Sequence, residues 1–342
     1  MTSHESSDIP DSLPAQTMWS VQARTRCVLE QAAALPFWNQ DYTQLSPGSF
    51  KGEIDSITTP DIQLFRESMN RSVDELASAP KNAYVIGIPN GMDGEAYWGL
   101  TAINSNSMIT LNKNAELTFR TSHNSEISAA VIQADRLEHY AETIMETDLR
   151  ALFRRIKPTE ALLPKHAIMM REMLYGSFRW THKMPLGLSD HAAWQHFEDD
   201  VLTTCVAALA STRPSSHKSS DHRIHRYAVN RVRDLVLASP LCPPTIGEIC
   251  EELRISRRSL NHAFTRVLGI SPVAYMRSIR LNRVRAALLQ ESATASTIAE
   301  IAMRWGFWHM SLFARYYREL FGELPSETRD GRTGRYVRTR NY

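Results

Sequence analysis

Two arginines near the end of the chain have the residue type and spacing of a helix face that binds an anion. Arg315 and Arg318 stand three residues apart in a segment whose apolar residues recur at helical spacing, so both point away from its apolar face. Their planar guanidinium groups can bond a phosphate or a guanine edge at two points. Gly322 and Pro325 mark the end of this helix, which is predicted over about 309–321.

A shorter helix must position this one, and a glycine turn joins the two. Thr297, followed by Glu300 three residues later, is a capping box that marks a helix start. Gly306 can adopt the left-handed conformation that turns one helix steeply into the next. Such a pair of helices has the layout of a helix-turn-helix unit, whose second helix enters the DNA major groove. An ordinary helical hairpin is the alternative.

The same unit occurs a second time, upstream. The stretch from Thr245 to Ile249 matches that from Thr297 to Ile301 at an offset of 52 residues. Later positions match at an offset of 53, namely Leu260, Phe264, Gly269 and Pro272. Two copies of one unit in about 85 residues argue against a plain hairpin. We therefore predict helix-turn-helix units at 245–268 and 297–321.

Charge is divided unevenly along the chain. The 342 residues are 43% hydrophobic and 22% charged, which suits a globular protein of two domains. The formal net charge is only +2. From Asp221 onward, however, 20 Arg and no Lys oppose 11 Asp and Glu, so this part carries +9 and the rest carries −7. A basic domain beside an acidic one is typical of a nucleic-acid-binding protein with a second module.

From about Ile224 to Arg329 the sequence resembles the DNA-binding domain of the AraC/XylS family of transcriptional regulators. The resemblance is carried by Gly306-Phe307, Tyr317-Arg318 and Phe321-Gly322 in the second unit, and by Leu253, Ser256 and Phe264 in the first. It implies an all-α DNA-binding domain over 223–329 that reads two successive segments of the major groove.

The resemblance also indicates which side chains of the first unit contact DNA. Ser256 is expected to cap the second helix. Matching by motif puts Arg258, Asn261 and His262 at base-facing positions, while Arg257 is the better phosphate ligand. A solvated arginine pair is the alternative, and the surrounding motif favours binding.

In the second unit, the matching base-facing positions are Ser311, Leu312 and Arg315, and Arg318 joins them on the outward face. Leu312 offers no hydrogen bond to a base, so it either contacts a thymine methyl group or packs inward. His309 occupies the usual cap position, where Ser would be a better cap. We include His309 among the DNA-binding residues.

The region before the repeat is rich in strand patterns. A helix is predicted from about Met18 to Leu35. Short strand-like segments with turn signals then run from about 50 to 133 and indicate an antiparallel barrel or sandwich, and helical patterns follow. We predict a disordered leader over 1–17, a β-rich domain over 18–212, a polar linker over 213–222 and an Arg-rich tail over 330–342 that frays.

The N-terminal part carries a resemblance of its own. The stretches DYTQLSPGSFKGEI and GIPNG, with RWGFWHM in the C-terminal part, are similar to the ethanolamine-operon regulators within the AraC/XylS family. This resemblance implies an α+β chain. It further implies that a β-rich, cupin-like domain with flanking helices would sense an effector and dimerise, and that the all-α DNA-binding domain follows it.

Aromatic residues supply candidates for the effector pocket. Trp38, Tyr84, Trp98 and Phe119 are the candidates, and the alternative is that each belongs to the hydrophobic core. The histidines show no metal-binding spacing, so we predict no metal, no cofactor and no catalytic residue. A cupin-like enzyme domain fused to a DNA-binding domain is the competing hypothesis.

These patterns predict a cytoplasmic, non-enzymatic, sequence-specific transcriptional regulator. We expect an activator controlled by a small-molecule effector, and an ethanolamine-type catabolic operon as its target. The expected partners are double-stranded DNA at tandem sub-sites, the effector, RNA polymerase and a second copy of the chain. No run approaches the ~18 apolar residues of a membrane helix, so no membrane partner is expected.

Overall fold

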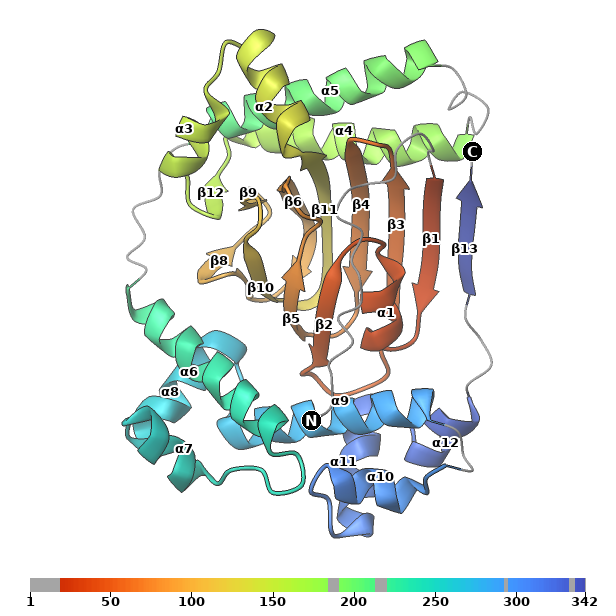
Figure 1. The fold of residues 1–342 in the computed structure, drawn as a ribbon, viewed down its shortest axis with the longest axis vertical. Helices are drawn as coiled ribbons and strands as arrows, with labels where there is room; N and C mark the ends of the chain where they lie inside the picture. Colours follow the sequence, from red (N-terminus) through yellow and green to blue (C-terminus); the bar gives the residue numbers. More distant parts are fainter. Residues whose placement is uncertain (1–18, 184–190, 213–219, 292–294, 332–335, 342) are drawn as a thin grey trace.

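A computed structural model describes residues 19–183, 191–212, 220–291, 295–331 and 336–341. The predicted leader and most of the predicted linker lie outside these residues. The order of elements is α+β, as expected: strands dominate the N-terminal part, and helices alone form the domain that follows. Figure 1 shows the helices of the C-terminal domain gathered at one end of the sheets, with four helices of the N-terminal domain at the other.

Two antiparallel sheets form the N-terminal domain. The eight-stranded sheet has the order β12-β9-β6-β11-β4-β3-β1-β13, and the five-stranded sheet has the order β2-β5-β10-β7-β8. The strands of the first are β1 Trp19–Thr25, β3 Gly52–Thr58, β4 Ile62–Met69, β6 Ala83–Asp93, β9 Ser107–Leu111, β11 His123–Gln133, β12 Thr159–Ala161 and β13 Tyr336–Asn341. Those of the second are β2 Asn39–Gln44, β5 Val73–Ser78, β7 Ala96–Trp98, β8 Thr101–Ile103 and β10 Glu116–Arg120.

Among the described residues, two large hydrophobic cores and one small cluster stabilise this domain; the small cluster holds Val28, Tyr42, Phe50, Met69 and Val73. The inner core lies between the sheets, because alternate residues of the strands in both sheets point inward. The outer core lies on the other face of the eight-stranded sheet, under four helices. These helices are α2 Ala134–Thr143, α3 Leu149–Arg155, α4 Pro164–Lys183 and α5 His191–Ala210.

The predicted helix from Met18 to Leu35 is wrong in its first half. Residues 19–25 form β1, and the helix there, α1, is Val28–Ala34. Val21 and Ala23 are buried in the inner core while Gln22 and Arg24 are exposed. This alternation has the period of a strand, and the sheet supplies the hydrogen bonds that a helix would otherwise make.

In the described part of the C-terminal domain, seven helices surround two cores. They are α6 Ser220–Ala238, α7 Ile246–Leu253, α8 Arg257–Leu268, α9 Pro272–Gln290, α10 Ile298–Arg304, α11 Met310–Phe321 and α12 Pro325–Asp330. Helix α9 contributes Tyr275 and Ile279 to the first core, and Leu281 and Leu288 to the second. It therefore joins the two halves of the domain.

The last described segment differs from the fraying tail that was predicted. Strand β13 pairs antiparallel with β1, with Trp19 opposite Asn341 and Arg24 opposite Tyr336. Strand β1 would otherwise be an edge of the sheet with unpaired backbone groups, and β13 satisfies them. Figure 1 shows β13 running beside β1, with the chain returning to it from the C-terminal domain.

Polar contacts hold the two domains together. Asp74 of β5 accepts hydrogen bonds from Arg226 of α6 at 3.0 Å and from the hydroxyl of Tyr275 at 2.7 Å. Asp41 of β2 is paired with both Arg233 and Arg283. The acidic edge of the five-stranded sheet thus neutralises three arginines of the basic domain.

Candidate DNA-binding interface

The first unit of the repeat begins with the predicted capping box. The hydroxyl of Thr245 accepts a bond from the backbone N–H of Glu248 at 3.3 Å, and Glu248 accepts one from the backbone N–H of Thr245 at 2.7 Å. That second bond lowers the pKa of the Glu248 carboxyl. Helix α7 ends at Arg254, which takes the left-handed conformation with φ 52°. Glycine is the residue best suited to that conformation, so Arg254 adds some strain.

Helix α8 presents the four side chains predicted for the first unit. Ser256 caps it through the backbone N–H of Ser259 at 3.1 Å. Leu260, Ala263, Phe264, Val267 and Leu268 are buried. The remaining face carries Arg257, Arg258, Asn261 and His262, and all four are exposed. The structure therefore brings the predicted residues together on one accessible helix face.

The second unit repeats this arrangement in α10 and α11. Thr297 and Glu300 form the same reciprocal capping box. Gly306 has φ 73°, and a Cβ there would lie 3.1 Å from the carbonyl oxygen of Leu241 and 3.1 Å from Pro243. The turn therefore needs glycine both for its backbone conformation and for space. His309 precedes α11 and makes no side-chain cap bond, as its residue type predicts.

Helix α11 also turns its predicted residues outward. Phe313, Tyr317, Leu320 and Phe321 are buried, whereas His309, Ser311, Arg315 and Arg318 are exposed. Leu312 is half-buried and is not among the described side chains that pack on the core of this unit. The ring of Tyr316 lies between two guanidinium groups, 4.1 Å from that of Arg277 and 5.4 Å from that of Arg315.

The exposed cations of these two helices are available to an anion. Within the described part of the chain, no ion pair joins Arg257, Arg258, Arg315 or Arg318 to a carboxylate. Guanidinium groups of this kind can bond phosphate or guanine. The arrangement supports phosphate and base contacts from both helix-turn-helix units, and α9 holds the two units in place relative to each other.

The four aromatic candidates for an effector pocket do not lie together. Trp98 and Phe119 pack in the inner core with ring centroids 5.2 Å apart, and Trp38 packs against the same core. Tyr84 belongs to the outer core, where its ring stacks on Phe153 at 4.3 Å. The sheet separates Tyr84 from the other three.

Two buried carboxyl groups beside Tyr42 of the small cluster, between the sheets, were not predicted from the sequence. Glu67 of β4 and Glu75 of β5 are each 2% exposed, and both lie at the hydroxyl of Tyr42. Burial raises the pKa of Glu67 to about 7 and that of Glu75 well above its usual range. Among the described residues, neither carboxyl contacts Arg, Lys or His. Gln31 donates a hydrogen bond to Glu67 at 3.0 Å.

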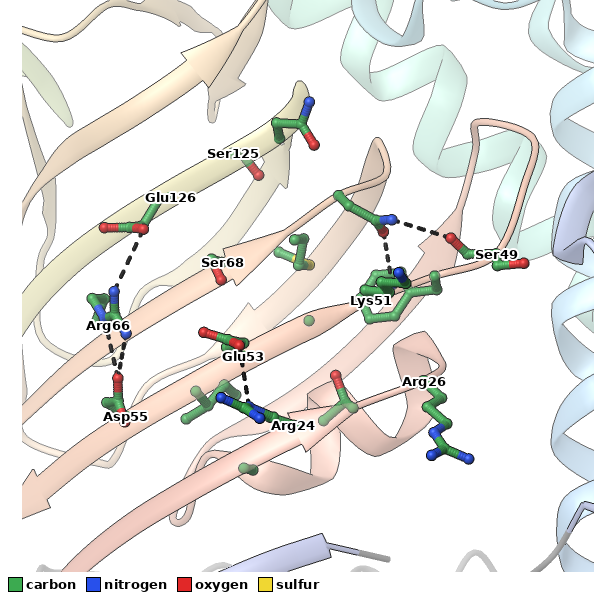
Figure 2. A pocket seen from close by; sticks show the side chains of 18 of the residues that line it. Arg24, Arg26, Ser49, Lys51, Glu53, Asp55, Arg66, Ser68, Ser125 and Glu126 are labelled. Carbon is green, nitrogen blue, oxygen red and sulfur yellow. Dashed lines mark hydrogen bonds and ion pairs between the residues drawn. The ribbon is translucent and has the colours of Figure 1, made fainter. Parts of the chain in front are cut away.

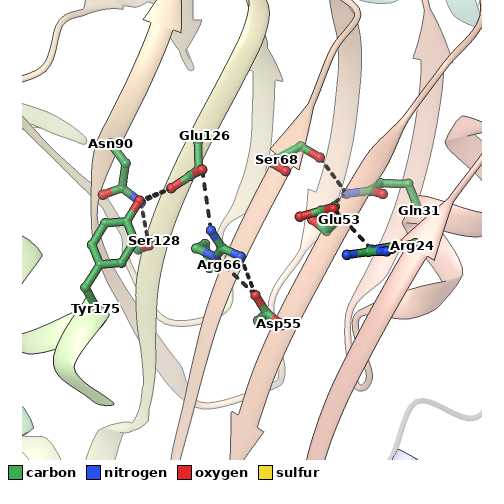
Figure 3. A network of polar contacts seen from close by, with 10 residues as sticks. All are labelled: Arg24, Gln31, Glu53, Asp55, Arg66, Ser68, Asn90, Glu126, Ser128 and Tyr175. Carbon is green, nitrogen blue, oxygen red and sulfur yellow. Dashed lines mark hydrogen bonds and ion pairs between the residues drawn. The ribbon is translucent and has the colours of Figure 1, made fainter. Parts of the chain in front are cut away.

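An open groove of about 1450 Å³ lies on the outer face of the eight-stranded sheet, and its lining reaches Arg285 and Phe321 of the C-terminal domain. Figure 2 shows charged side chains of both signs along it. Arg24 pairs with Glu53 at 3.3 Å. Arg66 lies between Asp55 and Glu126, at 2.5 and 3.6 Å, as Figure 3 shows. Most charges in the groove are therefore compensated within it.

The described residues contain neither a membrane-spanning helix nor a cluster of metal ligands. No helix there is both long and apolar enough to cross a membrane. No group of three or more His, Cys, Asp or Glu side chains there has the arrangement of a metal site. His123 begins β11 and His139 lies on α2, so these two histidines belong to different elements.

Comparisons with known proteins point to the repeat. A family model described as a helix-turn-helix domain matches residues 249–331. Over 84 residues the chain is 40% identical to the XylDLEGF operon transcriptional activator of Pseudomonas putida, a match that covers 25% of this chain and 26% of that protein. Two solved structures are also similar. An AraC-type transcriptional regulator from Chromobacterium violaceum is 30% identical over 32% of this chain and 94% of its own, with TM-score 0.30. ToxT from Vibrio cholerae is 14% identical over 93% of this chain and 100% of its own, with TM-score 0.31.

The fold and the exposed helix faces define a helix-turn-helix DNA-binding domain that follows a β-rich domain. The sequence match agrees with this, because residues 249–331 match the family model of a helix-turn-helix domain. The chain matches 26% of the length of that Pseudomonas relative.

Proposed function

We propose that the protein is a sequence-specific transcriptional regulator, and an activator, that binds double-stranded DNA through both helix-turn-helix units. One observation carries the proposal: two copies of one unit each expose a second helix whose arginines have no carboxylate partner among the described residues. Two units joined by α9 would read tandem major-groove sub-sites about 10 bp apart. An activating role is supported by the similarity to the Pseudomonas relative, which is named a transcriptional activator.

Sequencing the DNA bound by the full chain in cells tests this proposal. The expected result is a small set of enriched sites that share one motif. Transcription of the genes beside those sites should fall when the chain is deleted and recover when it is restored. Uniform coverage of the genome, or enriched sites whose neighbouring genes do not respond, would contradict the proposal.

We further propose that the N-terminal domain binds, between its two sheets, a small effector that carries an amino group. The support is the pair Glu67 and Glu75, two buried carboxyls that converge on Tyr42 without a basic side chain among the described residues. An ammonium group between them would restore the lost solvation of both carboxylates. Trp38, Trp98 and Phe119 supply aromatic surface in the inner core, which also lies between the sheets. An ethanolamine-type operon as the target agrees with this chemistry.

A melting experiment on the full chain tests the effector. Ethanolamine, with and without a cobalamin, is the first compound, followed by other small amines and amino alcohols. A ligand at a hundredfold excess over its Kd stabilises the folded state by about 2.7 kcal/mol. The rise in melting temperature should disappear in Glu75→Gln. If no amine raises the melting temperature, the amine proposal fails, whatever the DNA binding shows.

Three partner and location proposals accompany this function. A cytoplasmic location and contact with RNA polymerase are what an activator requires. A homodimer would let four helix-turn-helix units occupy adjacent sites. The enzyme hypothesis, a cupin-like catalytic domain, stays the alternative. Sedimentation of the purified chain, with and without DNA, measures the oligomer, and a monomer under both conditions would exclude the homodimer.

A further inference from the structure

The second helix-turn-helix unit is one residue longer than the first, and the structure shows that the additional residue is Trp308. Arg254 and Gly306 both take the left-handed conformation at the end of the first helix. The next residues also correspond, because Ile255 donates a backbone bond to Cys250 and Phe307 donates one to Ala302, five residues back in each case. Ser256 then begins α8 directly, whereas Trp308 stands between Phe307 and the cap residue His309. Trp308 therefore has no counterpart in the first unit.

Trp308 is presented to solvent from a rigid turn. Its side chain is 60% exposed, while Phe307 beside it is buried in the core of the second unit. The guanidinium of Arg280 lies 4.8 Å from the ring centroid of Phe307 and donates a 3.5 Å bond to the carbonyl of Gly306. Exposing an indole to water is unfavourable.

A second apolar side chain lies one turn further along the same helix end. Leu312 is on the first turn of α11, and it stays outside the core of the unit, as described above. At an offset of 53 its counterpart in α8 is Ser259, which is exposed and polar. The start of α11 is therefore apolar where the start of α8 is polar or basic. The first helical residues of such a helix are those that reach base edges.

We propose that the second unit recognises thymine through its C5-methyl groups, with Trp308 and Leu312 as the contacting residues, while the first unit reads hydrogen-bonding base edges. The methyl group of thymine is the apolar feature of the major groove, and apolar side chains are its natural partners. This inference rests on the proposed DNA binding and adds the specificity of one sub-site. Arg315 supplies the charged contact beside it.

Replacing thymidine by deoxyuridine removes one methyl group and leaves base pairing unchanged, so it tests the inference directly. A duplex selected from a random library with the full chain is the probe. Each thymidine in both sub-sites is replaced in turn, and affinity is measured at fixed salt. One or two substitutions in the second sub-site should weaken binding about fourfold each, the equivalent of ~0.8 kcal/mol for a buried methyl-sized group. Substitutions in the first sub-site should have no comparable effect.

Variants then assign the methyl contact to its side chains. In Trp308→Ala and Leu312→Ser the fourfold penalty should vanish, and Trp308→Phe should keep part of it. Ile144→Ala, which removes a similarly exposed apolar side chain at the end of α2, is the control and should keep the whole penalty. All three sites are exposed or half-buried, and a melting curve checks that each variant is folded.

The outcomes separate this inference from the proposed function. If no duplex is selected, DNA binding itself fails. If a duplex is selected but deoxyuridine costs nothing in the second sub-site, or costs the same in Trp308→Ala as in the natural chain, the methyl readout is wrong. Loss of transcription in Trp308→Ala with unchanged DNA affinity would also overturn it, because the indole would then serve a protein partner.

Discussion

The arginines of the two exposed helices differ in how firmly they are held. Arg315 is stacked at 5.4 Å on Tyr316, whose other neighbour is Arg277. Arg257 stands at the start of α8 with no such support among the described residues. A guanidinium held beside an aromatic ring is better oriented for a bidentate bond to a base edge.

We therefore predict opposite behaviour for two alanine variants. Arg315→Ala should lose about 1–3 kcal/mol on the selected duplex and little on scrambled DNA, with relaxed preference at one base position. Arg257→Ala should weaken binding to all sequences alike and reduce the salt slope by about 1. Titrations on both duplexes at several salt concentrations measure this. An equal loss on both duplexes for Arg315→Ala would make Arg315 a phosphate ligand.

The buried carboxyl Glu67 makes stability depend on pH. Its pKa is about 7 in the folded chain against an ordinary 4.5, so the folded state binds the proton more tightly. The resulting stabilisation is complete below about pH 4.5 and is lost as the pH rises through 7. Glu67→Gln removes this charge, so it should unfold at a higher denaturant concentration than the natural chain at pH 8 and at a similar one at pH 5. A lower midpoint at pH 8 would show that Glu67 is ionised and well solvated.

At the residue scale, the sequence predicted which polar side chains are exposed, but it did not predict which buried side chains lie next to one another. Every polar residue predicted to face DNA is exposed, and contact with DNA remains a prediction. Glu67 was readable in principle, because it shares a strand face with Phe65 and Met69. Its partner Glu75 lies on the other sheet, and no local pattern brings the two together. Tyr84 was grouped with Trp38, Trp98 and Phe119 for the same reason, because no local pattern shows on which face of the sheet each ring lies.

The two reading helices differ in their caps, which gives a prediction for the element. Ser256 caps α8, whereas His309 leaves α11 without a side-chain cap. Ser256→Ala should cost about 1 kcal/mol, and His309→Ser should gain a comparable amount, because a Ser hydroxyl accepts a bond from an orphan backbone N–H. Thermal unfolding of the full chain measures both. If His309→Ser destabilises the chain, the histidine must make a contact that outweighs a cap.

Helices were easier to predict than strands. The capping boxes at Thr245 and Thr297, the cap at Ser256, and Gly306 are local signals, and the structure confirms each. Strands β2 and β5 were missed because Asn, Gln, Asp and Glu interrupt them. They are strands because they pair with each other and because β5 also pairs with β10, which is a tertiary effect.

The contact between the two domains is a property of the whole molecule. Its most buried ion pair among the described residues joins Asp74 to Arg226. The side chains of Asp74 and Arg226 are 1% and 7% exposed. Asp74→Ala leaves Arg226 and the Tyr275 hydroxyl buried without their acceptor, so it should cost about 3–5 kcal/mol. Denaturant unfolding of the full chain measures this loss.

A surface pair provides the matched control for that variant. Glu53→Ala breaks an ion pair with Arg24 that is 87% and 50% exposed, so it should cost less than about 1 kcal/mol. Equal effects of the two variants would mean that the domains separate readily in solution and that Asp74 is then hydrated.

Division of the chain into a β-rich part and a basic helical part was predictable from charge and periodicity. Their mutual arrangement was not, because Asp41 and Asp74 meet arginines about 150 to 240 positions away in sequence. Nor was β13, whose pairing with β1 joins the two ends of the described chain. Contacts of this kind depend on three-dimensional closure rather than on local pattern.

Selection of duplex DNA from a random library by the full chain is the most direct test of the central claim, that the two units read DNA together. The account predicts one enriched motif with two parts whose centres lie about 10 bp apart. Affinity for the enriched duplex should fall steeply as salt rises, because each phosphate contact releases a counterion. A library that stays unenriched, or a single short motif unaffected by disabling the second unit with Arg315→Ala and Arg318→Ala, would contradict it.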